Sequence, residues 1–283
     1  MNAIMKGKIK KSICLLLAAA LVAVSMFFTG CVACTPFAEG NADRYAPESC
    51  ERKETVLTGK TFYWLGSSVT LGMASMEDAL PDYIAARNGA TCVKDAVSGT
   101  TLAGTDKDGY TERLITSELF DKDADIDAFF CQVSTNDAKK KAIDDLGSVT
   151  AADKTDYADL DRSTAAGGME YVVKYVEETW DCPIYFYTNA YIADEGERSI
   201  GDTKGSDYKK MINAVKEIAD KWNGMEGYDV RVIDLFDNEE FNDISDEEYA
   251  LYMYDAVHPY RAGYLEWWTP EVESRLIADM SEG

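Results

Sequence analysis

Short apolar runs alternate with segments of helical periodicity along most of this chain, and this alternation constrains the fold more than any other feature. The runs with the length and composition of buried strands are Thr61–Leu65, Thr91–Val97, Ile126–Val133, Pro183–Tyr187 and Val230–Leu235. The segments whose apolar residues recur at helical spacing are Glu77–Arg87, Tyr110–Leu119, Gly168–Trp180, Tyr208–Trp222 and Thr269–Met280. Strand–helix alternation is typical of βαβ units, whose strands are parallel. We therefore expect an α/β domain over residues 59–283, with a mostly parallel five-stranded sheet between two layers of helices.

The N-terminal residues have the pattern of an export signal. A lysine-rich start precedes an apolar run over residues 13–28, which is shorter than the roughly 18–20 residues of a membrane span. Thr29-Gly30-Cys31 follows and resembles the lipobox of bacterial lipoproteins, although Phe28 stands where leucine is usual. We expect residues 1–30 to be a signal peptide, Cys31 to be lipidated and residues 31–58 to be a tether. A secretory signal that is cleaved further along is the alternative. Both interpretations export the domain, either as a cell-surface lipoprotein or as a secreted protein.

Acidic residues outnumber basic ones, 51 to 28, and the formal net charge is -23. This excess argues against nucleic acid as a partner, because phosphate contacts need clustered lysine and arginine. It also argues against adsorption of the folded domain to anionic membranes, so the lipid anchor would be the only membrane contact. A metal site is not expected, because the chain has one histidine and the acidic stretch Asp237–Glu248 lacks the central glycine of an EF-hand.

His258 is the only histidine in the chain, so any acid–base chemistry by an imidazole near neutral pH depends on it. It stands in the string Asp255-Ala256-Val257-His258-Pro259. A carboxylate three residues upstream is a suitable partner to fix the tautomer of the ring and to stabilise its charged form. A histidine with a chance aspartate nearby gives the same pattern, so the pair alone leaves both interpretations open.

Polar turns follow the first three expected strands. They are Gly66-Ser67-Ser68-Val69-Thr70, Ser98-Gly99-Thr100-Thr101 and Ser134-Thr135-Asn136-Asp137. Each is ordinary turn chemistry by itself, but ligands of a parallel α/β sheet bind beyond the carboxyl ends of its strands. These turns supply a hydroxyl, a glycine N–H and a side-chain amide, and Asp255 and His258 near the C-terminus add an imidazole–carboxylate pair. Acyl transfer needs this set as nucleophile, oxyanion donors, base and orienting acid.

With these blocks in this order, the chain resembles the SGNH hydrolases, also called GDSL-type esterases and lipases, over about residues 60–280. That family is named for a serine, a glycine, an asparagine and a histidine in four sequence blocks. The resemblance implies a flavodoxin-like, three-layer α/β/α fold. It implies Ser68 as the nucleophile, His258 as the base and Asp255 as the orienting acid. It also implies activity without a cofactor. The implied oxyanion donors are Ser68, Gly99 and Asn136.

Two positions depart from the family's pattern. Ser67 replaces the usual aspartate before the nucleophile, which leaves open which of the two serines attacks. Ser134 stands where a glycine is common, two places before the asparagine. The order serine–acid–histidine also fits an α/β-hydrolase. Thr70 breaks the Gly-x-Ser-x-Gly elbow of that fold, and the acid and base lie on one short loop, so it is the second candidate.

The resemblance implies hydrolysis of carboxylic esters, with a small-molecule or glycan ester as substrate. We expect short acyl or acetyl groups, on carbohydrate or cell-wall glycan, from the habit of the family and the expected location. The candidates for the substrate pocket are Tyr191, Tyr260 and Trp267. An acyltransferase would use the same reacting residues, and a catalytically inactive surface-binding lipoprotein is a further alternative. The sequence leaves the oligomeric state open.

The charged segment 137–164 leaves the Asn136 turn directly and is long for a connection within a domain. Segments of this length without regular structure are typically functional or mobile, and we expect one of these here.

Overall fold

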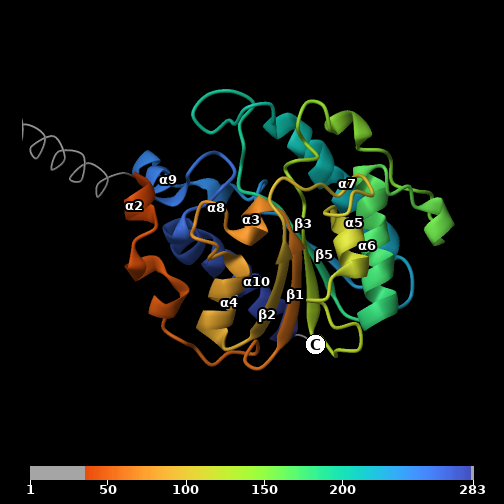
Figure 1. The fold of residues 1–283 in the computed structure, drawn as a ribbon, viewed down its shortest axis with the longest axis horizontal. Helices are drawn as coiled ribbons and strands as arrows, with labels where there is room; N and C mark the ends of the chain where they lie inside the picture. Colours follow the sequence, from red (N-terminus) through yellow and green to blue (C-terminus); the bar gives the residue numbers. More distant parts are fainter. Residues whose placement is uncertain (1–35, 282–283) are drawn as a thin grey trace, which may run out of the picture. The chain divides into compact units, whose positions relative to one another are not determined.

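The computed structural model describes residues 36–281, so the expected signal peptide and Cys31 lie outside the described residues. Five strands form one sheet in the order β2–β1–β3–β4–β5, and every neighbouring pair is parallel (Figure 1). The strands are β1 (Thr61–Gly66), β2 (Thr91–Ala96), β3 (Ala128–Gln132), β4 (Ile184–Tyr187) and β5 (Val230–Ile233). The expected α/β fold is confirmed, and each strand lies within one of the predicted runs or within a residue of its end.

Helices cover both faces of the sheet (Figure 1). One side carries α4 (Leu80–Asn88) and α10 (Thr269–Ser281), and the other carries α5 (Tyr110–Thr116), α6 (Ala165–Trp180) and α7 (Gly205–Asn223). The short α3 (Ser68–Leu71) follows β1 directly. The other helical segments are α2 (Pro36–Gly40), α8 (Glu239–Asn242), α9 (Asp246–Tyr252), a π-helix at Gly263–Trp268, and 3₁₀ turns at Asp43–Tyr45, Pro47–Ser49, Ile143–Asp145 and Tyr157–Asp159. Within residues 36–281, none of the helices combines the length and the apolar character that a bilayer-spanning segment needs.

The helix predicted from Glu77 begins at Leu80. Met76 and Glu77 have positive φ values of 61° and 66°, which exclude them from a right-handed helix. The carboxylate of Asp82 accepts the N–H of Ala79 at 2.8 Å and so caps the first turn. The local backbone before the helix therefore sets its start, which the spacing of apolar residues does not indicate.

Aromatic rings stack across the three central strands. The ring of Trp64 on β1 lies over that of Phe130 on β3, with centroids 3.9 Å apart, and Phe130 stacks on Tyr185 of β4 at 5.0 Å. Every residue of β3 is buried, as expected of a strand that helices cover on both faces. This packing fixes the positions of the strands whose carboxyl ends carry the polar turns.

The segment predicted as a tether, residues 31–58, belongs in part to the folded unit, which begins at Gly40. The side chains of Tyr45 and Leu57 are buried in the core. The amide of Asn41 donates a 2.9 Å hydrogen bond to the carbonyl of Ala74. The structure thus places the start of the folded unit before the expected boundary at residue 59, because the core covers a few apolar side chains of an otherwise polar segment.

A buried ion pair anchors the long segment between β3 and α6. Glu170 of α6 is fully buried, the side chain of Lys221 of α7 is 6% exposed, and the two side chains form an ion pair. Glu170 also accepts hydrogen bonds from the N–H of Thr150 at 3.0 Å and from its hydroxyl at 2.9 Å. Lys221 donates to the carbonyl of Lys154 at 2.9 Å. The segment 137–164 is therefore fixed near its middle to two helices.

Replacing Glu170 with alanine is expected to lower the free energy of unfolding by about 3–5 kcal/mol, because it leaves a buried ammonium without its counter-ion. Glu178→Ala is the matched control on the same helix. Glu178 pairs with Lys174, but its side chain is 48% exposed, so this loss should stay below about 1 kcal/mol. Urea denaturation followed by circular dichroism measures both changes. Equal losses in the two variants would contradict a stabilising role for the buried pair of Glu170 and Lys221.

Candidate active site

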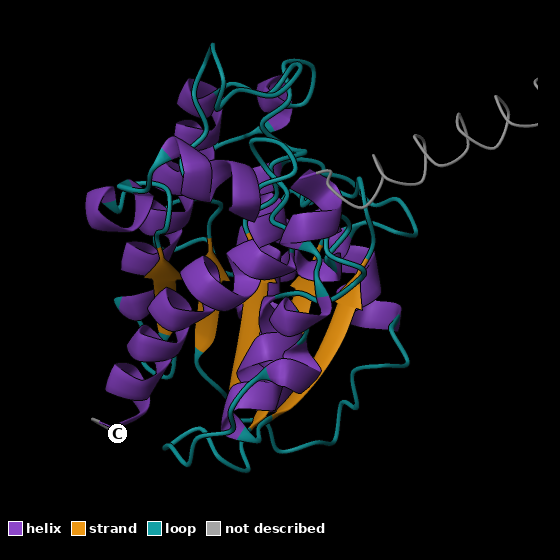
Figure 2. Ribbon diagram, turned by 90° about the vertical axis from the view of Figure 1, so that its left-hand side faces the viewer, coloured by secondary structure: helices purple, strands orange, loops and turns teal. Residues whose placement is uncertain are grey.

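The carboxyl ends of all the strands point to one edge of the sheet, where loops gather (Figure 2). At this edge β1 ends at Gly66, and the chain turns through Ser67 into α3, whose first residue is Ser68. A Cβ at Gly66 would overlap the hydroxyl of Thr70, so only glycine allows this turn. The turn leaves Ser68 at a helix start, where the helix itself does not use the backbone N–H.

Ser68, His258 and Asp255 form a continuous row of hydrogen bonds. Ser68 Oγ lies 2.8 Å from His258 Nε2, and His258 Nδ1 lies 2.9 Å from each carboxylate oxygen of Asp255. Asp255 Oδ1 also accepts the backbone N–H groups of Val257 and His258, at 2.8 and 2.9 Å. An acid at Nδ1 makes that nitrogen the protonated one. Nε2 is then free to accept the proton of the serine hydroxyl.

The carboxyl group of Asp255 is held in its charged form. Burial alone would raise its pKa, but the hydrogen bonds from the His258 ring and from two backbone N–H groups outweigh burial. They hold the pKa of Asp255 below its usual value. The carboxylate is therefore ionised throughout the neutral range, and it can stabilise a positive charge on the imidazole.

The two adjacent serines point to different surroundings. Ser67 is fully buried, and its N–H and hydroxyl donate to Gln132 Oε1 at 3.0 and 3.4 Å. The same oxygen accepts the N–H and the hydroxyl of Thr70, at 3.3 and 2.8 Å. Ser68, and not Ser67, is thus the serine that contacts the imidazole. The sequence gives little indication of Gln132, which is a polar residue near the end of an apolar run.

The three predicted oxyanion donors follow the adjacent strands β2, β1 and β3. The N–H groups of Ser68 and Gly99 have no hydrogen-bond acceptor among residues 36–281. Gly99 has a φ of 81°, and a Cβ there would meet no atom within 4 Å, so its surface is open. The amide of Asn136 donates one hydrogen to the carbonyl of Thr100 at 3.0 Å, which leaves its second hydrogen for a ligand. The Gly99 turn and Asn136 are therefore joined directly.

Arg113 of α5 ties the serine turn to the glycine turn. The residue is buried, and all five of its N–H donors are used. Nη2 donates to the carbonyl of Gly66 at 2.7 Å and to the hydroxyl of Thr100 at 3.3 Å. Nη1 donates to the carbonyl and carboxylate of Asp95 at 2.8 and 2.5 Å, and Nε donates to the carbonyl of Asp108 at 2.8 Å. Arg113 was not predicted as a site residue, because one arginine in a predicted helix resembles surface charge.

Asp137 holds the same glycine turn from the side of β3. Its carboxylate accepts the N–H groups of Leu102 and Ala103, at 2.8 and 2.9 Å. Burial raises the pKa of Asp137 to about 6, against the opposing effect of these hydrogen bonds. Near neutral pH the ionised carboxylate thus accepts two backbone donors of the loop that carries Gly99.

The three aromatic residues predicted for the substrate pocket differ in exposure. Tyr191 is 44% exposed, whereas Tyr260 and Trp267 are buried. Trp267 stacks on Phe241 with centroids 4.6 Å apart, and its Nε1 donates to the carbonyl of Phe241 at 2.6 Å. The structure therefore places Tyr260 and Trp267 in the core, where they offer little ring surface to a substrate, and leaves Tyr191 as the accessible ring.

Known proteins share this architecture. The family model described as GDSL-like Lipase/Acylhydrolase matches residues 56–268. A protein from Lactobacillus plantarum is similar in structure, with a TM-score of 0.57, 20% sequence identity, and coverage of 78% of this chain and 98% of that one. A family two carbohydrate esterase from Clostridium thermocellum, solved in complex with cellohexaose, is also similar, with a TM-score of 0.51 and 16% sequence identity. The match covers 79% of this chain and 66% of the esterase chain. No curated protein matches this chain.

Proposed function

We propose that this chain, which belongs to the GDSL-like lipase/acylhydrolase family and is a hydrolase acting on ester bonds, is a serine esterase with Ser68, His258 and Asp255 as its reacting groups. The observation that carries the proposal is the 2.8 Å contact between Ser68 Oγ and Nε2 of the chain's only histidine. A serine hydroxyl is too weak an acid to attack an ester unaided. A neutral imidazole at this distance supplies the base that it needs.

The reaction has two steps on these residues. His258 Nε2 takes the hydroxyl proton of Ser68 while Oγ attacks the carbonyl carbon of the ester, and Asp255 stabilises the imidazolium that forms. The proton then passes to the leaving alcohol, and the acyl group stays on Ser68. A water molecule repeats the sequence: it gives a proton to His258 and attacks the acyl carbon, and His258 then returns the proton to Ser68 Oγ as the carboxylic acid leaves.

Three donors receive the negative charge that develops on the carbonyl oxygen. They are the N–H groups of Ser68 and Gly99 and the free amide hydrogen of Asn136. Donors that are fixed before the reaction stabilise the transition state without reorganisation, and one such donor is typically worth about 3–4 kcal/mol. Arg113 and Asp137 hold the segments that carry these donors, which supports the assignment.

The proposed substrate is a short acyl ester, such as an acetyl ester, of a carbohydrate. A hollow of about 380 Å³ beside Gly99 is lined mostly by polar residues, among them Thr100, Thr101, Asp106 and Lys107. Such a wall suits a small acyl group better than a long hydrocarbon chain, because charged groups lose water without replacement when apolar atoms cover them. The fold shared with a carbohydrate esterase agrees with this choice.

The proposed location is outside the cytoplasm. Residues 1–30 have the charge and apolar pattern of a signal peptide, and Cys31 follows a lipobox-like pair. In this proposal the protein is a surface lipoprotein that touches the membrane only through its lipid, or it is secreted after cleavage further along. Mass spectrometry of the N-terminal peptide of the membrane-extracted protein distinguishes a diacylated Cys31 from a free new terminus.

A fluorophosphonate probe is expected to label Ser68, because that hydroxyl lies beside a base, whereas the buried Ser67 should stay unmodified. Peptide mass spectrometry locates the adduct, and turnover of p-nitrophenyl acetate should fall in proportion to labelling. A protein that neither reacts with the probe nor cleaves the ester would contradict the proposal and favour an inactive binding protein. Transfer of the acyl group to an added alcohol as well as to water would identify an acyltransferase.

A further inference from the structure

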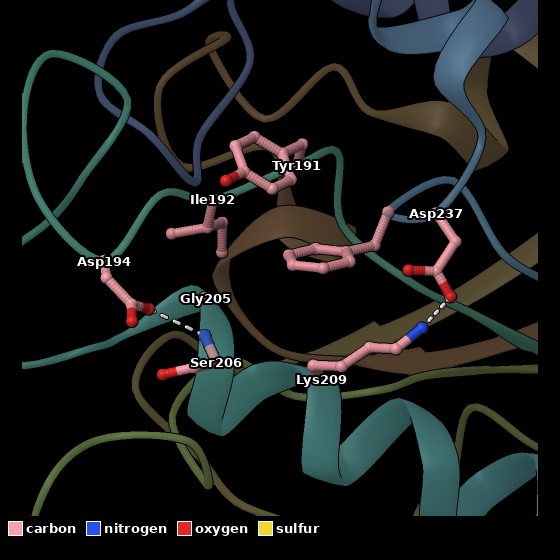
Figure 3. A pocket seen from close by; sticks show the side chains of 8 residues that line it. Tyr191, Ile192, Asp194, Gly205, Ser206, Lys209 and Asp237 are labelled. Carbon is pink, nitrogen blue, oxygen red and sulfur yellow. Dashed lines mark hydrogen bonds and ion pairs between the residues drawn. The ribbon is translucent and has the colours of Figure 1, made fainter.

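A pocket of about 430 Å³, whose lining residues are drawn in Figure 3, includes residues that follow β4 and β5, at the same edge of the sheet as Ser68. The residues of this pocket that matter here are Tyr191, Asp194, Ser206, Lys209, Phe236 and Asp237. We propose that it binds the sugar part of a carbohydrate ester whose acyl carbonyl lies at Ser68. This inference rests on the proposed esterase function and adds the place and chemistry of the alcohol subsite.

Two hydrogen bonds join chain segments next to pocket residues to segments that carry reacting groups. The amide of Asn189, just after β4, donates to the carbonyl of Val257 at 2.8 Å, one residue before the imidazole. On the other side, the N–H of Lys140 donates to the carbonyl of Asp202 at 2.9 Å. This bond joins the segment that follows the oxyanion amide to the segment that precedes α7. The segments that precede Tyr191 and Gly205 of the pocket are therefore hydrogen-bonded to the loops that carry His258 and Asn136.

Tyr191 gives the pocket an exposed aromatic wall. Its backbone N–H donates to Asn242 Oδ1 at 2.9 Å, and its ring lies 5.2 Å from that of Phe236 at an angle of 42°. These contacts fix the ring while 44% of the residue stays exposed. A rigid aromatic face has a large contact area and loses little conformational entropy on binding. The C–H face of a pyranose ring matches such a surface in shape and polarity.

The remaining walls carry both donors and acceptors. Asp194 accepts the N–H of Ser206 at 2.7 Å, and Lys209 forms an ion pair with Asp237 (Figure 3). Each carboxylate has more lone pairs than these contacts use, so it can accept further hydrogen bonds. Lys216 pairs with Asp237 as well, so the charges of this wall already have partners and a charged ligand would have to displace an ion pair. A hydrocarbon chain would bury the charges without hydrogen bonds. A neutral ligand with several hydroxyl groups satisfies both conditions.

Tyr191→Ala tests the inference with two esters that share an acetyl group and a primary alcohol, 6-O-acetylglucose and n-hexyl acetate. Loss of the aromatic wall should raise KM for 6-O-acetylglucose by about five- to tenfold and leave kcat nearly unchanged. KM for n-hexyl acetate should not change, because that ester has no sugar. Tyr191→Trp should retain the wild-type KM. Tyr157→Ala, which removes an exposed tyrosine that does not line the pocket, is the matched control and should alter neither substrate.

A rise of KM for 6-O-acetylglucose alone supports the inference. Equal effects on both esters, no effect on either, or a wild-type protein that cleaves only n-hexyl acetate would overturn it and leave the esterase proposal standing. A wild-type protein that cleaves neither ester and is not labelled at Ser68 would instead overturn the proposed function itself.

Discussion

Ser68→Ala is expected to lower kcat for p-nitrophenyl acetate by about 10⁴-fold or more, because it removes the hydroxyl that contacts His258, the proposed base. Alanine removes Oγ and leaves the backbone N–H in place, so an ester can still bind but cannot transfer its acyl group to the protein. The residual rate would come from the oxyanion donors and from binding alone.

Ser67→Ala is the matched control, because it removes an identical hydroxyl one residue earlier. The Ser67 hydroxyl donates to Gln132, inside the protein and away from the imidazole. Its loss should change kcat by less than about tenfold, since it removes one hydrogen bond beneath the turn. Circular dichroism and urea denaturation check that both variants fold. A Ser67→Ala protein as inactive as Ser68→Ala, with normal stability, would show that the nucleophile is misassigned.

Asp255→Asn is expected to lower kcat by about 10⁴-fold while KM changes little. The backbone N–H groups of Val257 and His258 both donate to one side of the acid, so the amide oxygen of asparagine should settle there. The NH₂ group would then face Nδ1 of the imidazole. Nδ1 becomes an acceptor, Nε2 carries the proton, and the ring can no longer take the proton of Ser68.

Asp246→Asn is the matched control for this change. Asp246 begins α9, a few residues upstream, and its side chain is 91% exposed. Its neutralisation alters the charge near the site by the same amount without touching the imidazole. The kinetics are measured for both variants from pH 6 to pH 9. If Asp255→Asn retained more than a tenth of the wild-type kcat across that range, the acid would not control the tautomer of His258.

The strands that the sequence predicts most directly are those that are buried on both faces of the sheet. β3 and β4 are continuous apolar runs because helices cover both of their sides, so their composition alone indicates them. The segment from Asn41 to residue 58 is different. It contributes only a few buried side chains, such as Tyr45 and Leu57, between exposed polar ones. Such a pattern has no period, and only the tertiary contacts show that the segment is folded.

The same distinction applies to the candidate site. Ser68 and Asn136 are predictable in position because each lies in a turn directly after a strand, and the chain order of turns follows from the fold. Gln132 and Arg113 act through contacts across neighbouring strands and loops, which local sequence does not encode. The choice between Ser67 and Ser68 also depends on geometry, since the two residues differ only in the direction of their side chains.

During synthesis, the strands of the sheet are made before the segment that contains His258. The last strand ends at Ile233, whereas His258, which contacts Ser68, lies 190 residues after that serine in the chain. A nascent chain that has emerged as far as β5 holds every strand of the sheet and the serine, but no group that can activate it. In the proposed mechanism the reacting groups therefore come together only after the strands of the sheet have been made, and the unfinished chain would lack the base that ester cleavage needs.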